Sequence, residues 1–319
     1  MGVAPWPICA EEGRMSVRLA LSTVCVFAVV ALWAASLVGA RSGQREETDT
    51  GEVLPAGVPG RFVVVNGRRV HVVERGDGPP LLLVHGFGGS TFDFEELVLD
   101  PLARSHRAIA VDLYGFGWSE RSDDFRYGWT LWSDELAGAL DALGIERASI
   151  AGHSMGGAVA AVFAARHPER VDRLILADAL YPSEPGEVPL VFRALRTPIV
   201  GELALGLVGD PSPPGSSAAY RARALPWYRV RGTRSAWLRY VRDATKRDEL
   251  AAAYPAIAAP TLILHGTDDE SVPYAAMERA APAIRAARIV PLPGGHHFLL
   301  RDAPDRFVRE VDAFLAEPR

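Results

Sequence analysis

Ser154 is the residue best placed for chemistry in this chain, because it lies in the sequence Gly-His-Ser-Met-Gly. This matches the pattern G-x-S-x-G, in which a sharp turn between a strand and a helix exposes a serine hydroxyl. Gly152 and Gly156 suit such a turn, since its tightness leaves almost no room for side chains. A serine hydroxyl becomes a nucleophile when a nearby base takes its proton. Alone, the pattern also fits an ordinary glycine-rich turn.

The sequence on both sides of Ser154 predicts the elements that this turn requires. Residues 147–151 are short and apolar enough for a buried strand, and residues 158–166 are good helix formers. Other apolar runs predict strands at 62–65, 69–73, 80–84, 107–111, 173–177, 261–264 and 287–290, and helices at 91–103, 130–143 and 304–316. Strands that alternate with helices indicate a three-layer α/β fold with a mostly parallel sheet, whose ligands bind at the carboxyl ends of the strands.

Five glycine-rich or charged segments follow predicted strands: HGFGG at 85–89, DLYGFGWS at 112–119, GHSMGG at 152–157, GTDDESVP at 266–273, and 297–304, which runs from a histidine to a proline. Their sequences and their order resemble the α/β-hydrolase family over nearly all of residues 62–316. The resemblance implies an eight-stranded, mostly parallel sheet flanked by helices. It also implies a catalytic triad in the order serine, acid, histidine, which Ser154, Asp269 and His297 satisfy.

The family pattern also selects the acid. It resembles G-x-x-D-x-x-x-P after the strand, and Gly266, Asp269 and Pro273 fit it. Asp268 is one residue out of register and is interpreted as a solvated turn carboxylate. Asp178, after the preceding strand, occupies the alternative acid position of some relatives, but a strand-end turn role is favoured for it.

The base is chosen between two adjacent histidines. In relatives the histidine lies seven residues before a proline that opens the last helix and five before an acidic residue. His297 has these spacings to Pro304 and Asp302, whereas His296 does not. His297 with Phe298 also resembles the His-Phe of haloalkane dehalogenases. A metal site at the histidine pair is disfavoured, because no further ligand lies at a suitable spacing.

Two backbone donors are needed to stabilise the oxyanion of a tetrahedral intermediate. The N–H of Met155, directly after the nucleophile, is one candidate, and the N–H of Phe87 is the other. His85 and Asp112 are interpreted as structural residues of their loops.

A serine nucleophile argues against haloalkane dehalogenases and epoxide hydrolases, whose nucleophile in this fold is an aspartate. The predicted function is hydrolysis of a carboxylic ester or related acyl substrate, with an apolar substrate expected, through an acyl-enzyme. Carbon–carbon bond hydrolysis, haloperoxidase-like perhydrolysis and acyl transfer use the same triad and stay open. A slow-turnover binding or signalling protein of this fold is a further alternative. A scaffold protein without catalytic activity is disfavoured, because no position of the triad is lost.

Composition excludes several other classes. The net charge of −5 and the pI near 5.9 argue against nucleic-acid binding. Cys9 and Cys25 are the only cysteines, and both are near the N-terminus. The rest of the chain therefore has no disulfide framework and no cysteine-based zinc site. No cofactor and no metal are predicted.

The N-terminal part predicts a membrane or signal helix. Residues 19–40 carry no charge and are long enough to span a bilayer. An uncleaved anchor with an extracytoplasmic body is favoured, with a secreted protein cleaved after Ala40 as the alternative; Met1 and Met15 are both possible starts. The predicted organisation is an N-terminal segment (1–18), this helix (19–40), a linker (41–60), a hydrolase core (61–180 and 254–319) and a helical cap (181–253). In the cap segment the strand pattern stops and aromatic residues lie among arginines.

Overall fold

The fold is built on one eight-stranded sheet in the order β1-β2-β4-β3-β5-β6-β7-β8. The structure is a computed structural model that describes residues 54–95, 97–182, 217–243 and 247–318. The strands are β1 (Arg61–Val65), β2 (Arg68–Arg75), β3 (Pro80–Val84), β4 (Arg107–Val111), β5 (Ala148–His153), β6 (Val171–Ala177), β7 (Thr261–Gly266) and β8 (Ala287–Leu292). Only the pairs β1–β2 and β2–β4 are antiparallel. This confirms the predicted mostly parallel sheet.

The burial of each strand follows its sequence. β5 and β7 are buried at every position, as expected for central parallel strands covered on both faces. β1 lies at the edge and alternates exposed with buried residues in its second half. The turn between β1 and β2 places Asn66 and Gly67 at φ 51° and 77°, the left-handed conformation that an Asn-Gly hairpin turn requires.

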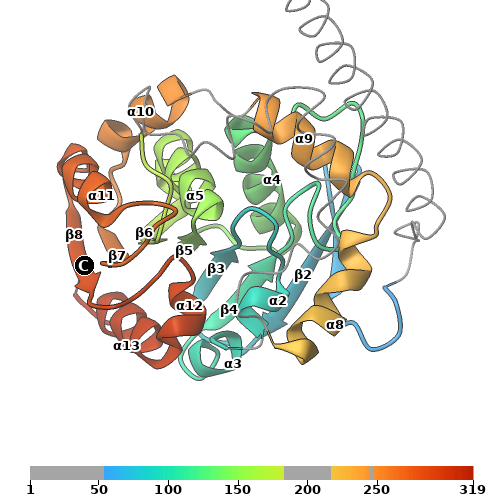
Figure 1. The fold of residues 1–319 in the computed structure, drawn as a ribbon, viewed down its shortest axis with the longest axis horizontal. Coiled ribbons are helices and arrows are strands. Elements are labelled where there is room, and N and C mark those ends of the chain that lie inside the picture. Colours follow the sequence, from blue (N-terminus) through green and yellow to red (C-terminus); the bar gives the residue numbers. More distant parts are fainter. Residues whose placement is uncertain (1–53, 96, 183–216, 244–246, 319) are drawn as a thin grey trace, which may run out of the picture.

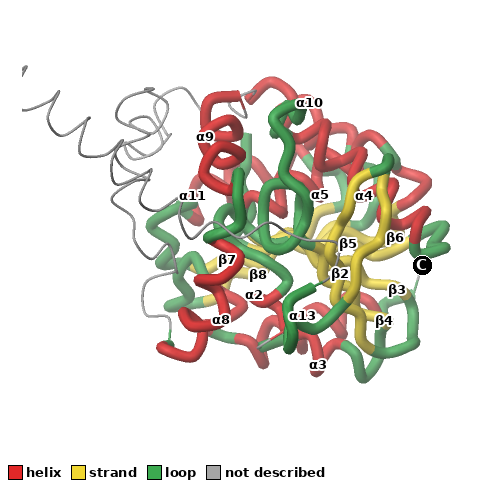
Figure 2. The backbone as a smooth tube through the Cα atoms, turned by 90° about the vertical axis from the view of Figure 1, so that its right-hand side faces the viewer, coloured by secondary structure: helices red, strands yellow, loops and turns green. Residues whose placement is uncertain are grey.

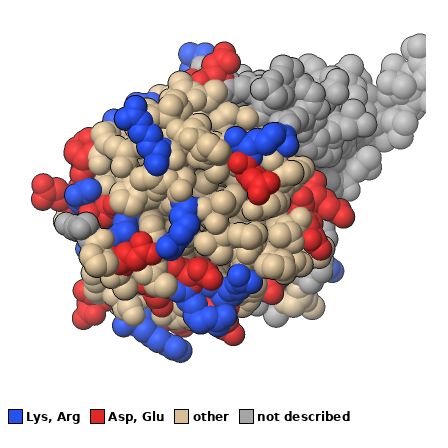
Figure 3. All heavy atoms as spheres, turned by 90° about the vertical axis from the view of Figure 1, so that its left-hand side faces the viewer, with Lys and Arg blue, Asp and Glu red and all other residues tan. Residues whose placement is uncertain are grey.

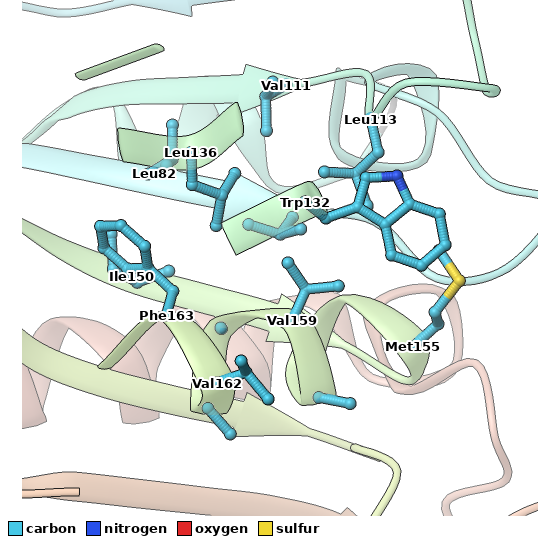
Figure 4. Close-up of a cluster of buried hydrophobic side chains, with 14 of the residues drawn as sticks. Leu82, Val111, Leu113, Trp132, Leu136, Ile150, Met155, Val159, Val162 and Phe163 are labelled. Atoms are coloured by element: carbon cyan, nitrogen blue, oxygen red, sulfur yellow. The ribbon is translucent and has the colours of Figure 1, made fainter. Parts of the chain in front are cut away.

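Helices cover both faces of the sheet (Figures 1 and 2). On one face lie α4 (Trp129–Ala142) and α5 (Met155–Arg166), and on the other lie α3 (Leu99–Leu102) and α13 (Pro304–Leu315). Figure 4 shows the first layer, where Trp132 of α4 lies beside Met155 and Val159 of α5. On the second face, Phe307 and Phe314 of α13 join a separate buried cluster. These two cores hold the strand ends in place.

The predicted helix at 91–103 is wrong in its extent. The segment forms two short helices, α2 (Phe92–Glu95) and α3, instead of one. Pro101 gives the physical reason, because it has no N–H to donate to the carbonyl of Leu97, so a helix from α2 cannot continue through it. Pro101 is tolerated only because α3 begins anew at Leu99 and keeps the proline in its first turn.

The segment predicted as a helical cap contains α8 (Ala218–Tyr228), α9 (Thr233–Asp243) and α10 (Arg247–Ala256) in its described part. Residues 183–216 of that segment lie outside the described residues, as do the predicted membrane or signal helix at 19–40 and most of the linker. Within the described ranges, no helix is long and apolar enough to cross a membrane. The remaining elements are α11 (Tyr274–Ala280), α12 (Leu299–Asp302) and the 3-10 turns η2 (Pro168–Arg170) and η3 (Ala281–Ala283).

Charge on the surface is mixed where it can be inspected. Figure 3 shows the face on the β8 side, where basic and acidic side chains alternate over short distances. Nucleic-acid-binding domains present a continuous basic stripe instead. The described residues of this face have no such stripe.

Candidate active site

The turn from β5 into α5 holds Ser154 in a strained conformation. Its φ is 53° and its ψ is −118°, which non-glycine residues rarely adopt. The turn is so close that a Cβ on Gly152 would lie 2.3 Å from the carbonyl oxygen of Gly156, and a Cβ on Gly156 would lie 2.2 Å from that of Val84. The two glycines are therefore required sterically, and the strand–turn–helix prediction agrees with the structure.

The structure brings the three predicted triad residues into one hydrogen-bonded relay. His297 Nε2 lies 2.9 Å from Ser154 Oγ, and His297 Nδ1 lies 2.8 Å from Asp269 Oδ2. Since a carboxylate only accepts, Nδ1–H donates to Asp269 and Nε2 is left to accept from the serine hydroxyl. Ser154 and Asp269 are 7% and 5% exposed, so the relay is largely shielded from water while His297 stays partly accessible.

Asp269 is held as a carboxylate by its own loop. Its Oδ1 accepts the N–H groups of Ser271 and Val272, both at 2.8 Å. Burial acts to raise the pKa of Asp269, but the hydrogen bond and charge of His297 and the N–H of Val272 outweigh it, so the pKa lies below its usual value. An ionised acid is what the imidazolium formed during catalysis needs.

Asp268 and His296, which neighbour the acid and the base in sequence, lie outside the hydrogen-bonded relay. Asp268 is exposed, and its Oδ1 accepts the hydroxyl of Thr267. His296 is exposed, and its Nδ1 lies 3.2 Å from the carbonyl oxygen of Asp268. Neither has a hydrogen bond to Ser154 among the described contacts.

Asp178, the alternative acid position, connects the two loops that carry the acid and the base. Its Oδ1 accepts the N–H of Gly266 at 2.9 Å, and its Oδ2 accepts the N–H of Leu299 at 3.1 Å. Burial raises the pKa of Asp178 to about 7, and the charge of Asp269 adds to this. The described partner of His297 Nδ1 is Asp269, so Asp178 has the structural role that the sequence favoured.

His153 is a site residue that the sequence reasoning missed. Its Nε2–H donates to the carbonyl oxygen of His297 at 2.7 Å, which fixes the backbone that carries the base. Burial lowers the pKa of His153 to about 3, so its ring is neutral. Its position directly before Ser154 was the available signal, because a residue next to the nucleophile on the strand end must face a neighbouring loop.

The two predicted oxyanion donors lie on either side of Ser154. Met155 is the first residue of α5, where helical N–H groups lack intrahelical partners. Phe87 lies in the turn from Gly86 to Gly89, closed by the hydrogen bond from Gly89 N to Gly86 O at 3.1 Å. A Cβ on Gly86 would lie 3.1 Å from the Cβ of Ser154, so this turn approaches the nucleophile directly. Their role as donors remains a prediction.

An aromatic cluster continues from this turn. The ring of Phe87 stacks on Tyr240 at 5.5 Å and contacts Trp237 at 5.1 Å, both on α9, and packs edge-on against Phe116. Tyr240 in turn contacts Trp132 of α4. The ring of Phe87 therefore belongs to a largely buried aromatic cluster.

A second histidine–carboxylate pair, also missed, lies away from the relay. His71 Nδ1 donates to Asp112 Oδ2 at 2.7 Å, and His71 Nε2 donates to the carbonyl oxygen of Pro59 at 2.9 Å. Asp112 also accepts the N–H groups of Thr91 and Trp118. Asp112 thus holds its own loop, as the sequence indicated.

One group of potential metal ligands overlaps the relay. Ligand atoms of Asp178, His265 and Asp269 lie within 4.8 Å of one another. However, both oxygens of Asp178 accept backbone N–H groups, and those of Asp269 are used by its loop and by His297. His265 Nε2 donates to the carbonyl of Val272. A cation here would have to displace the hydrogen bonds that form the relay.

Comparison with known proteins places this geometry in a family. A family model described as alpha/beta hydrolase fold matches residues 79–197. The chain is 32% identical over 278 residues to a 2-hydroxymuconate semialdehyde hydrolase of Pseudomonas sp. strain CF600, covering 81% of this chain and 94% of that protein. The chain belongs to the α/β-hydrolase family. The turn at Ser154 and the loop of His297 therefore lie in a protein of this family.

Two solved α/β-hydrolase structures are similar at 26% sequence identity. A meta-cleavage product hydrolase from Pseudomonas fluorescens IP01 aligns with a TM-score of 0.63, covering 81% of this chain and 97% of that chain. A bacterial membrane phospholipase A also aligns with a TM-score of 0.63, covering 96% of this chain and 98% of that chain. The family thus includes relatives with different substrates.

Proposed function

We propose that this α/β-hydrolase cleaves a carboxylic ester or a related acyl substrate through an acyl-enzyme. The observation that carries the proposal is the unbroken relay, with 2.8 Å between Asp269 and His297 and 2.9 Å between His297 and Ser154. A serine, a histidine and a carboxylate at these distances can activate an alcohol and then protonate a leaving group.

The steps follow from the positions of the protons. His297 Nε2 accepts the proton of Ser154 as Oγ attacks the carbonyl carbon, and Asp269 stabilises the imidazolium that forms. The oxyanion accepts hydrogen bonds from the predicted donors, the N–H groups of Met155 and Phe87. The imidazolium then protonates the departing alcohol. A water molecule, deprotonated by His297, hydrolyses the acyl-enzyme and restores Ser154.

The aromatic cluster supports an apolar acyl group. The ring of Phe87, next to the nucleophile turn, contacts both Trp237 and Tyr240. Burying apolar surface contributes roughly 25 cal/mol per Å², so a longer or aromatic acyl chain that reaches the partly exposed ring of Phe87 should gain affinity.

Hydrolysis of a carbon–carbon bond is the second candidate, because the similar proteins include a 2-hydroxymuconate semialdehyde hydrolase and a meta-cleavage product hydrolase. As its name states, the muconate substrate carries a carboxylate, which a binding site must compensate with charge or hydrogen bonds. The ring cluster around Phe87 has no charged side chain among its described members, which supports the ester as the first candidate.

A paired assay separates the two candidates. The full chain is given p-nitrophenyl esters of graded acyl length and, in parallel, a 2-hydroxy-6-oxo-dienoate whose conjugated absorbance is lost on cleavage. The expected result is ester turnover that increases with acyl length and disappears in Ser154→Ala. Cleavage of the dienoate with a higher kcat/KM than any ester would establish the second candidate. Absence of turnover on both would contradict the proposed function.

We also propose that residues 19–40 tether the protein to a membrane, with the hydrolase body outside the cytoplasm. The uncharged length of this segment supports the tether, and a membrane phospholipase A is among the similar structures. The expressed full chain should sediment with membranes and be released by detergent but not by high salt. Release into the medium of a protein whose intact mass begins near Arg41 would contradict the tether.

A further inference from the structure

Two cap helices converge on the four-residue turn from Gly86 to Gly89. From α8, the hydroxyl of Tyr228 donates to the carbonyl oxygen of Gly88 at 2.9 Å. From α9, Trp237 and Tyr240 pack on the ring of Phe87. Tyr228 and Trp237 also contact each other edge-on at 5.7 Å. The turn next to the nucleophile is therefore held from its outer side by the cap.

The conformation of this turn is one that needs outside support. Gly88 has φ 74°, so the third residue of the turn is in the left-handed region and the turn resembles a type II turn. Glycine is flexible there, and three of the four residues are glycines. A rotation of the peptide planes in this turn would change the direction of the N–H of Phe87, the predicted oxyanion donor.

We infer that Tyr228 is a positioning residue: by holding the carbonyl of Gly88, it fixes the turn whose Phe87 N–H faces the developing oxyanion. This rests on the proposed function and on Phe87 as the donor. Donors aimed at an oxyanion act mainly in the transition state. Loss of the Tyr228 hydroxyl should therefore lower kcat and leave KM nearly unchanged.

A purely structural role for Tyr228 would be to anchor the cap. Tyr220 provides the matched control for that role, because it lies on the same helix and its hydroxyl donates to Asp93 Oδ1 at 2.5 Å. Asp93 lies in α2, outside the Gly86–Gly89 turn. Tyr220→Phe and Tyr228→Phe each remove one cap-to-core hydrogen bond and keep the ring. Tyr228 bonds to the turn directly, whereas Tyr220 reaches it only through Asp93, whose Oδ2 accepts the N–H of Ser90 just after the turn.

The test measures kcat and KM of full-length wild type, Tyr228→Phe and Tyr220→Phe on the best p-nitrophenyl ester. Tyr228→Phe should lower kcat about tenfold with KM within about twofold, a fraction of the 10²–10³-fold effect of deleting an oxyanion donor. Tyr220→Phe should keep kcat within about twofold. Equal effects of the two substitutions on kcat, or a change confined to KM, would overturn the inference.

Binding of an aryl trifluoromethyl ketone gives an independent readout. Ser154 adds to its carbonyl, and the resulting oxyanion occupies the same position as that of the intermediate. Its affinity should fall in Tyr228→Phe by about the same factor as kcat/KM and stay unchanged in Tyr220→Phe. Unchanged affinity in Tyr228→Phe would overturn the inference.

Failure of the proposed function has a different signature. If the wild-type protein neither hydrolyses the esters nor labels at Ser154 with a fluorophosphonate, the acyl-enzyme proposal fails and the inference falls with it. If the wild type turns over and labels, but the two tyrosine variants behave alike, only the positioning role of Tyr228 is refuted.

Discussion

Two of the histidine–carboxylate pairs among the described residues, His71–Asp112 and His297–Asp269, have nearly equal distances, and only the second is suited to catalysis. His71 and Asp112 are 2.7 Å apart, and His297 and Asp269 are 2.8 Å apart. The first pair is fully buried, whereas the side chain of His297 is 15% exposed. The distance between histidine and acid therefore does not define the active site.

The difference lies in the second ring nitrogen. His297 Nε2 faces the hydroxyl of Ser154, which can give up a proton, whereas His71 Nε2 donates to the carbonyl of Pro59, which cannot. His71 must carry protons on both nitrogens to make both bonds, so it is an imidazolium. Burial acts to lower the pKa of His71, but the charge and hydrogen bond of Asp112 outweigh this effect. The pKa of His71 therefore lies above its usual value. The His297 pair is therefore placed to exchange a proton with Ser154, whereas His71 and Asp112 form a buried ion pair with no such partner.

Removing the hydroxyl that distinguishes the pairs should have the largest effect. Ser154→Ala should lower kcat about 10⁴–10⁶-fold, because the base then has no nucleophile to activate. Ester kinetics and labelling with a fluorophosphonate probe check this. An alanine variant that still labels at this turn would show that another residue is the nucleophile.

Substituting the base should give an effect of the same order and test its assignment. His297→Ala should lower kcat about 10⁴–10⁶-fold, whereas His296→Ala, one residue away and exposed, should stay within a few-fold of wild type. The kcat values of the two purified variants decide the matter. Near-normal activity of His297→Ala with loss in His296→Ala would reverse the assignment.

Matched substitutions of the two acids should separate catalysis from stability. Asp269→Asn should lower kcat about 10⁴-fold with a small change in unfolding free energy, since it upsets the tautomer of His297. Asp112→Asn should instead cost about 3–5 kcal/mol of stability, because the buried imidazolium of His71 loses its counter-charge. The kcat of its folded fraction should stay within about tenfold.

Urea unfolding and ester kinetics on both acid variants provide the measurements. If Asp112→Asn lowered kcat as much as Asp269→Asn at unchanged stability, the second pair would be part of the catalytic machinery. If Asp269→Asn mainly destabilised the fold, the relay would be structural.

The smallest predicted effect is on the pH dependence of stability. The pKa of His71 is raised in the folded protein, so its contribution is fully present below its unfolded value near 6.5 and is lost as pH rises through the folded value. The pKa of Asp112 is lowered, although burial opposes this, so its contribution is present above about 3.8 and is lost at lower pH. Both contributions coexist between these values.

Thermal unfolding of His71→Gln against wild type checks this. The difference in Tm, a few degrees at most, should be largest between pH 4 and 6.5 and should shrink at alkaline pH. A difference that grew as pH rose would show that His71 is neutral in the folded protein.

The sheet and the Ser154–His297–Asp269 relay could be predicted from the sequence, because short local patterns indicate both. The elbow around Ser154 needs glycines at fixed offsets, and apolar runs of strand length precede each functional loop. Pro101 is the local sequence signal for the break between α2 and α3. Asp269 and His297 followed from motif spacing, and their geometry then agreed.

The remaining contacts could not be predicted from local patterns. His71 reaches Asp112 across the antiparallel register of β2 and β4, over 41 residues of sequence. Tyr228 reaches Gly88 over 140 residues, from a segment without periodic pattern. Such contacts depend on the three-dimensional path of the long segments between the two residues. A short window of sequence does not indicate that path.

The neighbouring strands β6 and β7 have a consequence for the evolution of this enzyme. Ala177 pairs with Leu264, and Leu174 pairs with Thr261, although the whole cap is inserted between the two strands. The entropy of closing a connection grows only with the logarithm of its length, so doubling it costs about 0.6 kcal/mol. Insertions and deletions here thus scarcely disturb the sheet. This segment can therefore vary at little cost to the sheet, but a change that removes Tyr228 would also release the Gly86–Gly89 turn.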